Sequence, residues 1–171
     1  QPEHVVSAAI SPQLTAYDKG RLAVLYRDLV ATAEAIPGVE SAAVAMCGLM
    51  TGCRSIVDGL TITGYVSQPG EQVMLQENYV GPRYFETVGM RLVAGRDFEE
   101  RDVAPRETVA IINETAARRY FKDRSPIGQR FGEDKADIEI IGVVADARVN
   151  TVRDAILPMA YYRLPPGETA S

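Results

Sequence analysis

Apolar residues recur every three or four positions over residues 18–36, and this spacing predicts an amphipathic helix. Pro37-Gly38 follows and ends the helix, because proline cannot continue the hydrogen-bond ladder and glycine suits a left-handed cap. Short apolar runs at residues 5–10 and 39–46 predict strands, so the chain opens with a predicted β-α-β unit. The apolar stripe of the helix consists of Leu22, Leu25, Tyr26, Leu29, Ala33 and Ile36.

A second strand-helix-strand pattern follows later in the chain. Residues 108–112 and 138–145 predict strands, and the unbroken apolar run of the second indicates burial on both faces. Between them Asn113 can cap a helix over residues 114–121. The other predicted elements are strands at residues 60–65, 73–80 and 159–164 and one or two helical turns at 82–88. In the last strand, alternation predicts that one of Tyr161 and Tyr162 lies in the core and the other at its rim.

This order of elements predicts an α+β fold with a mixed sheet and two main helices. A chain of 171 residues is expected to form a single domain over residues 1–171, or two small lobes. A main lobe would combine residues 1–46 with 132–166, and a smaller, loop-rich lobe would hold residues 47–131. Residues 79–102 predict a packing hub without chemistry of its own, in which Gly81, Gly89 and Gly95 separate short apolar runs.

Composition narrows the function classes. The chain is 46% hydrophobic and 24% charged, as in ordinary soluble proteins, and its net charge of −5 argues against nucleic acid as a partner. No apolar run reaches the ~18 residues that a membrane helix needs. Because the chain begins at Gln1 rather than Met, we expect it to be a processed product or a piece of a longer protein.

Cys47 and Cys53 are the two cysteines of the chain, and they are close enough in sequence to form a disulfide. Loop entropy gives such a short ring about 2 kcal/mol of stabilisation. The spacing matches no common zinc or redox motif. The residues alone leave a disulfide and two free thiols as open alternatives.

The residues predict no catalytic, cofactor-binding or metal site. His4, the one histidine, lies in the N-terminal segment and is expected to be exposed. The carboxylate clusters at residues 99–102 and at Glu133-Asp134 with Asp137 are typical of solvated surface, although an acid–base pair is the alternative. Arg118-Arg119 is interpreted as a solvated helix face, with a partner-binding patch as the alternative.

Several stretches in order resemble the MacB-like periplasmic core domain of FtsX/MacB-type ABC transporter permeases. The hallmark is VGPRYFETVGMRLVAGRDF at residues 80–98. Similar stretches are IPGVESAAVA (36–45), VAIINETAARRYF (109–121), SPIGQRF (125–131), IEIIGVVADAR (138–148) and LPMAYYRL (157–164). The resemblance covers roughly residues 17–164, and it is weakest over residues 47–72.

The resemblance implies a non-enzymatic extracytoplasmic domain, on the periplasmic side of the bacterial inner membrane, in a multi-pass protein. It implies that a cytoplasmic ATPase of the parent transporter uses ATP, and that this domain has no cofactor. The implied partners are the transmembrane helices and that ATPase, a second copy in a homodimeric transporter, and a periplasmic adaptor. The domain would transmit movement by mechanotransmission. A periplasmic setting would also permit the Cys47–Cys53 bond.

Two other function classes stay open. A lipid- or peptide-binding sensor domain is suggested by the glycine-rich middle of the chain and its eight tyrosines. An apolar cavity would favour it. A carboxylate-dependent hydrolase would need two facing carboxylates, one of them with a raised pKa.

Overall fold

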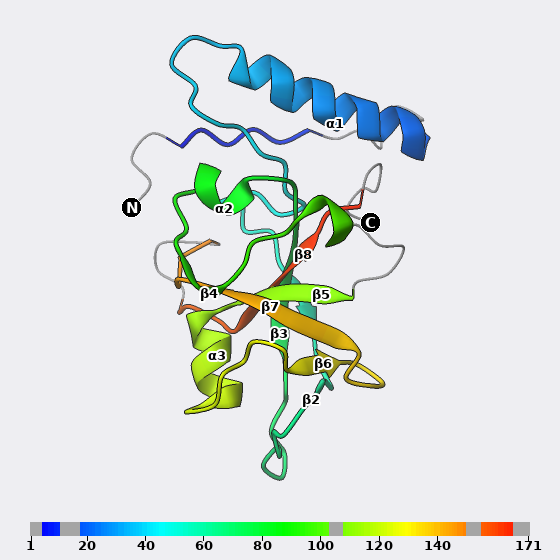
Figure 1. The fold of residues 1–171 in the computed structure, drawn as a ribbon, viewed down its shortest axis with the longest axis vertical. Helices are drawn as coiled ribbons and strands as arrows, with labels where there is room; N and C mark the ends of the chain where they lie inside the picture. Colours follow the sequence, from blue (N-terminus) through cyan, green and yellow to red (C-terminus); the bar gives the residue numbers. More distant parts are fainter. Residues whose placement is uncertain (1–4, 11–17, 103–107, 150–154, 166–171) are drawn as a thin grey trace.

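An eight-stranded sheet forms the centre of the molecule in a computed structural model, which describes residues 5–10, 18–102, 108–149 and 155–165 (Figure 1). The strands are β1 (Ser55–Val57), β2 (Thr61–Ile62), β3 (Leu75–Val80), β4 (Leu92–Gly95), β5 (Val109–Asn113), β6 (Arg130–Gly132), β7 (Ile138–Val144) and β8 (Met159–Arg163). The helices are α1 (Lys19–Glu34), α2 (Tyr84–Thr87) and α3 (Glu114–Phe121), with a 3-10 turn, η2, at Glu100–Asp102.

The sheet is mixed, as the sequence predicts. Its strand order is β1-β3-β8-β5-β7-β6-β2, and β4 pairs with β7 outside this path. The pairs β3–β8 and β5–β7 are parallel, whereas the remaining pairs are antiparallel. Together with its helices, the sheet forms an α+β fold.

The sheet curls, because the strands at its two ends are neighbours in the sequence. Residues 58–60 are all that separates β1 from β2. A chain spans at most about 3.6 Å per residue, so these two strands approach within about 14 Å. Leu60 also donates a backbone hydrogen bond to the Val73 carbonyl at 3.2 Å, just before β3. The strands therefore wrap into an incomplete barrel.

Each face of the sheet packs against its own hydrophobic cluster. On one face, Ile112, Tyr120 and Tyr162 belong to a cluster with residues of α3. On the other face, Ile111 and Tyr161 belong to a cluster with α2. The prediction that one of the two tyrosines is core and the other rim is wrong, since both are buried. The reason is that β8 lies between β3 and β5, with a cluster on either side.

The predicted packing hub is confirmed in the second cluster. Phe85 is buried against Tyr161, with ring centroids 5.0 Å apart, and stacks on Phe98 at 6.3 Å. Gly95 has a φ of +75°, and a Cβ there would meet the backbone of Ile141, so only glycine fits this turn beside β7.

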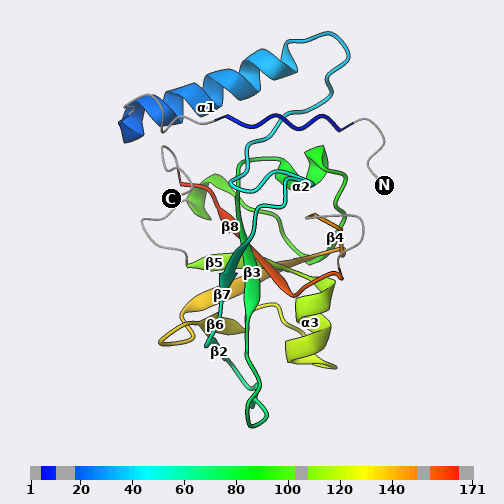
Figure 2. The ribbon, with the colours of Figure 1, turned by 180° about the vertical axis from the view of Figure 1, so that it is seen from behind.

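Helix α1 forms where the apolar stripe predicts it, and Asp18 caps it by accepting a hydrogen bond from the Arg21 N–H at 2.8 Å. Its stripe is incompletely covered: Leu22 is buried, whereas Leu29 and Ile36 are exposed. Figures 1 and 2 both show α1 and residues 5–10 at one end of the molecule, and the connection between β2 and β3 at the opposite end.

The predicted β-α-β unit at the start of the chain is wrong. Residues 5–10 are in no strand, and their side chains are exposed, so apolar character there does not reflect burial in a sheet. Residues 39–46 contribute one isolated bridge, Ala45 to Val80, with hydrogen bonds to the end of β3. The sheet instead contains β1, β4 and β6. These are short strands that the residue pattern does not predict as separate elements.

Both of the predicted lobes contribute strands to the same sheet. Strands β3 and β5 come from residues 47–131, and β7 and β8 come from residues 132–166. The boundaries of the two lobes stay a prediction.

Candidate functional site: the polar joint at α3

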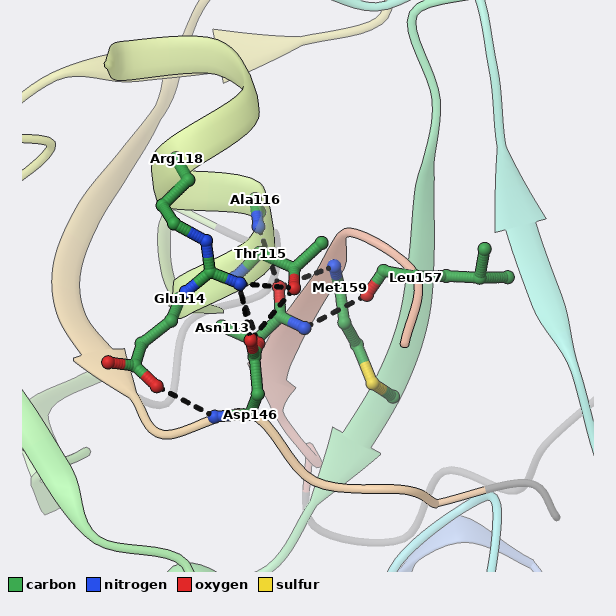
Figure 3. Close-up of polar contacts among 8 residues, drawn as sticks. All are labelled: Asn113, Glu114, Thr115, Ala116, Arg118, Asp146, Leu157 and Met159. Carbon is green, nitrogen blue, oxygen red and sulfur yellow. Dashed lines mark hydrogen bonds and ion pairs between the residues drawn. The ribbon is translucent and has the colours of Figure 1, made fainter. Parts of the chain in front are cut away.

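A cluster of polar side chains joins three distant segments at the start of α3 (Figure 3). We call it the α3 joint and define it as Asn113, Glu114, Thr115, Arg118 and Asp146. The sequence places it here because β5 ends at Asn113, which directly caps α3, and because β7 ends just before Asp146. The start of β8 lies against the same point, since β8 pairs with β5.

The buried part of the α3 joint is the carboxamide of Asn113. Its Oδ1 accepts hydrogen bonds from the N–H groups of Ala116 at 2.9 Å and Met159 at 3.0 Å. Its Nδ2 donates to the Leu157 carbonyl at 2.9 Å. One buried side chain therefore caps α3 and fixes the start of β8.

The outer part of the α3 joint is the carboxylate of Asp146. It accepts hydrogen bonds from the N–H and the hydroxyl of Thr115, both at 2.9 Å, and from Arg118 Nη2 at 2.6 Å. In return, the Glu114 carboxylate accepts from the Asp146 N–H at 3.2 Å. The end of β7 is thus held to the first turn of α3 by reciprocal contacts.

The electrostatics of the α3 joint favour the charged form of Asp146 near neutral pH. Burial alone would raise the pKa of Asp146, but Arg118 and the two donors of Thr115 outweigh burial, so the pKa is lowered from its ordinary value. The hydrogen bond to Asp146 likewise raises the pKa of Arg118. A carboxylate held in this way is a poor proton donor or acceptor near neutral pH, so the geometry suits mechanical connection better than acid–base chemistry.

Residues near the C-terminal end of α3 contact the connection between β2 and β3. We call this connection, residues 63–74, the arm. The Tyr120 hydroxyl donates to the Met74 carbonyl at 2.6 Å and accepts from the Met74 N–H at 3.2 Å. Arg119 pairs with Glu71 at 3.3 Å, and Arg124 donates to the Gly64 carbonyl at 2.9 Å. Helix α3 therefore links the arm to the end of β7 and the start of β8.

A family model described as the MacB-like periplasmic core domain matches residues 4–170 of this chain. The chain belongs to the MacB-like periplasmic core domain family.

Among curated relatives, the macrolide export ATP-binding/permease protein MacB of Aggregatibacter actinomycetemcomitans is 31% identical over 70 residues, which are 41% of this chain and 11% of that protein. The MacB 1/2 protein of Paracoccus denitrificans is 38% identical over 64 residues, 37% of this chain and 10% of that protein. The matches thus span about a tenth of the length of these relatives.

The fold of this MacB-like domain is also that of a solved relative. It matches the crystal structure of the periplasmic region of MacB from Actinobacillus actinomycetemcomitans with a TM-score of 0.51 and 21% identity. The match covers 81% of this chain and 54% of that one. At this level of identity the likeness shows the shared α+β fold.

The two sequence-predicted carboxylate clusters of this MacB-like domain differ in exposure. Glu133, Asp134 and Asp137 are exposed, as predicted. The 99–102 cluster is not wholly solvated, because the side chain of Asp102 is 6% exposed and pairs with Arg96 at 2.7 Å. Within the described residues, no group of three or more His, Cys, Asp or Glu side chains is arranged to hold a metal ion. His4 lies outside the described residues.

The interpretation of Arg118-Arg119 as a solvated helix face is incomplete, because each arginine forms an ion pair with a carboxylate from another segment. Cys47 and Cys53 have Cα atoms 5.3 Å apart, a separation that a disulfide spans. No helix in the described part of the MacB-like domain has the length and apolar character needed to cross a membrane.

Sequence reasoning did not single out Asp146 or Asn78. The signal for Asp146 is its position, since it follows directly after the most apolar strand. The signal for Asn78 is an amide inside an otherwise buried strand, where a polar side chain needs partners. It finds them in Cys47, whose N–H donates to Asn78 Oδ1 at 2.9 Å and whose carbonyl accepts from Asn78 Nδ2 at 3.0 Å.

Proposed function

We propose that this MacB-like domain is the extracytoplasmic part of an ABC transporter permease and that it transmits movement without catalysing a reaction. The observation that carries the proposal is the family match over residues 4–170. In this proposal the domain lies on the periplasmic side of the inner membrane. A cytoplasmic ATPase of the parent transporter consumes the ATP, and the domain needs no cofactor.

The α3 joint and the arm contacts support a mechanical role. A part that transmits movement must not deform where its segments meet, and the buried amide of Asn113 fixes such a meeting point. Because the arm is bound to α3 through Tyr120 and Arg119, a displacement of the arm is passed to the end of β7 and the start of β8. These contacts lie in the half of the molecule that is opposite α1 (Figures 1 and 2).

The proposed partners follow from the same family. They are the transmembrane helices and ATPase of the parent, and a second copy of the domain in a homodimeric transporter. A periplasmic adaptor is a further proposed partner, and the exposed end of the arm, where Val66 is 84% exposed, is a suitable place for such contact.

The experiment uses the full-length parent transporter with its ATPase, reconstituted in lipid nanodiscs. A spin label at Val66→Cys reports the distance between the two arms of a dimer with and without ATP and vanadate. We expect the distance distribution to change with nucleotide, and Asn113→Ala to weaken that change while ATP hydrolysis persists. An unchanged distribution during ATP hydrolysis, or a transporter without a second copy, would contradict the proposal.

A separate measurement distinguishes the other function classes. Chain 1–171 is incubated with phospholipid vesicles and with a peptide library, and binding and turnover are measured. We expect neither saturable binding nor turnover. Saturable binding at micromolar concentration would favour a sensor domain instead, and turnover would favour an enzyme.

A further inference from the structure

The loop between Cys47 and Cys53 contacts two segments that are far apart in sequence. At its start, Cys47 is buried and its backbone is bound on both sides by the side chain of Asn78 in β3. In its middle, the Met50 N–H donates to the Val149 carbonyl at 2.7 Å, five residues after β7 ends. At its end, Cys53 is half-buried and leads into β1.

The conformation of this loop is one that a free segment would leave readily. Met50 has a φ of 59°, a left-handed conformation that non-glycine residues adopt at a cost, and its side chain is 51% exposed. The loop's own contacts include a hydrogen bond from Thr51 Oγ1 to the Gly48 carbonyl at 2.9 Å. A covalent ring closed by Cys47 and Cys53 would limit the other conformations of the loop and so favour the Met50–Val149 hydrogen bond.

We propose that Cys47 and Cys53 form a disulfide that acts as a redox-breakable clamp, holding this loop on the segment that follows β7. That segment contains Asp146 of the α3 joint, and Val149 is buried in the second cluster. The clamp therefore stiffens the chain between the α3 joint and the loop. Its regulatory meaning rests on the proposed force-transmitting function, whereas its existence does not.

A dithiol reductant of the thioredoxin class would open the clamp in two steps. A thiolate of the reductant attacks Cys53 Sγ, the more accessible sulfur, and forms a mixed disulfide as the bond to Cys47 breaks. Cys47 leaves as a thiolate and takes up a proton. The second thiol of the reductant then displaces Cys53, so the reductant leaves oxidised and both cysteines are reduced.

The test compares oxidised and reduced chain 1–171 by amide hydrogen exchange. We expect the reduced chain to gain two hydrogens in mass and to exchange the Met50 amide about tenfold faster or more, because ring closure no longer limits the loop. Amides of β5 serve as the internal reference and should keep their protection. The Cys53→Ser variant should match the reduced wild type without any reductant.

The matched control is the double variant Cys47→Ser, Cys53→Ser, on which reductant should have no effect. The clamp is refuted if the air-oxidised chain contains two free thiols, or if reduction leaves the Met50 amide exchange unchanged. Either result leaves the proposed transport function standing, because that function is tested by the arm distances in the full-length transporter. Conversely, unchanged arm distances would leave the clamp itself intact.

Discussion

Helices α1 and α3 differ in a way that their lengths would not suggest. Helix α1 has 16 residues and a capped N-terminus, yet Leu22 is the one fully buried residue among its described side chains. An ion pair between Glu34 and Arg83, at 2.9 Å, connects α1 to the residue that precedes α2. Helix α3 has 8 residues, but three are buried. Its cap Asn113 binds the start of β8, and Arg118 binds Asp146 just after β7. How firmly a helix is coupled to a fold depends on its contacts with other elements, and not on its length.

The largest expected contrast between the two helices lies in their apolar contacts. Ile112→Ala, in the cluster beneath α3, should lower the free energy of unfolding by about 4 kcal/mol, because Ile112 is 1% exposed and truncation leaves a cavity. Leu29→Ala on α1, at 37% exposure, should cost less than about 1 kcal/mol. Urea denaturation of both variants measures the difference, and equal costs would contradict the contrast.

The second largest contrast is expected between the N-terminal caps of the two helices, measured as the loss of free energy of unfolding when each cap is removed. Asn113→Ala removes three hydrogen bonds and leaves the partly buried Leu157 carbonyl and the buried Met159 N–H without this partner, so we expect a loss of about 3 kcal/mol. Asp18→Ala removes one exposed cap bond on α1 and should cost about 0.5–1 kcal/mol.

Thermal and urea unfolding of the two cap variants give the comparison. Asn113→Asp is the intermediate case, since it keeps the acceptor and loses the amide donor. A cost at Asn113 no larger than that at Asp18 would show that the α3 joint adds nothing beyond an ordinary cap.

Matched tyrosine variants test the link between α3 and the arm. Tyr120→Phe removes the hydroxyl that binds both backbone groups of Met74 and should cost about 1–1.5 kcal/mol. It should also speed amide exchange at Met74. Tyr26→Phe on α1 should change stability by less than about 0.5 kcal/mol. If Tyr120→Phe leaves the Met74 amide unchanged, the arm is not held through this hydroxyl.

The smallest expected contrast concerns pH. Because the pKa of Asp146 is lower in the folded chain than in the unfolded one, its stabilising contribution is present above the unfolded pKa and is lost as pH falls through the folded pKa. Wild type should therefore lose about 1 kcal/mol more than Asp146→Asn between about pH 5 and pH 2, since the partner Arg118 is largely exposed.

The control for the pH experiment is Asp28→Asn on α1. Asp28 pairs with Arg27, and both side chains are more than half exposed. This substitution should leave the pH dependence of stability as in wild type. Urea midpoints at several pH values measure all three proteins, and parallel curves for wild type and Asp146→Asn would contradict the prediction.

Local signals in the sequence were sufficient for α3 and β7. A capping residue followed by apolar residues at helical spacing predicts α3, and an unbroken apolar run predicts a strand buried on both faces. The same kind of signal gave wrong strand predictions at residues 5–10 and 39–46, because a short apolar run does not specify whether a partner strand is within reach. Strand β1 has three residues and β2 has two, so pairing with distant strands defines them more than their own pattern does.

The sequence predicts the local contact of the α3 joint but not its long-range contacts. Asn113 was expected to cap α3, which is a contact three residues along the chain. Its bonds to Leu157 and Met159 span 44 and 46 residues, and they exist because the sheet topology brings the start of β8 beside the end of β5. Sequence periodicity carries no information on that topology. The family resemblance, by contrast, depends on the order of whole motifs and was confirmed over residues 4–170.

The central position of β8 has a consequence for how the domain would respond to tension. Strand β8 has a parallel ladder with β3 on one side and an antiparallel pairing with β5 on the other. A pull along the axis of β8 loads these hydrogen bonds in shear, all at once, since they lie perpendicular or slanted to the strand. A hairpin at the edge of the sheet would instead unzip one bond at a time. A force applied along β8 would thus be shared by its hydrogen bonds to β3 and to β5.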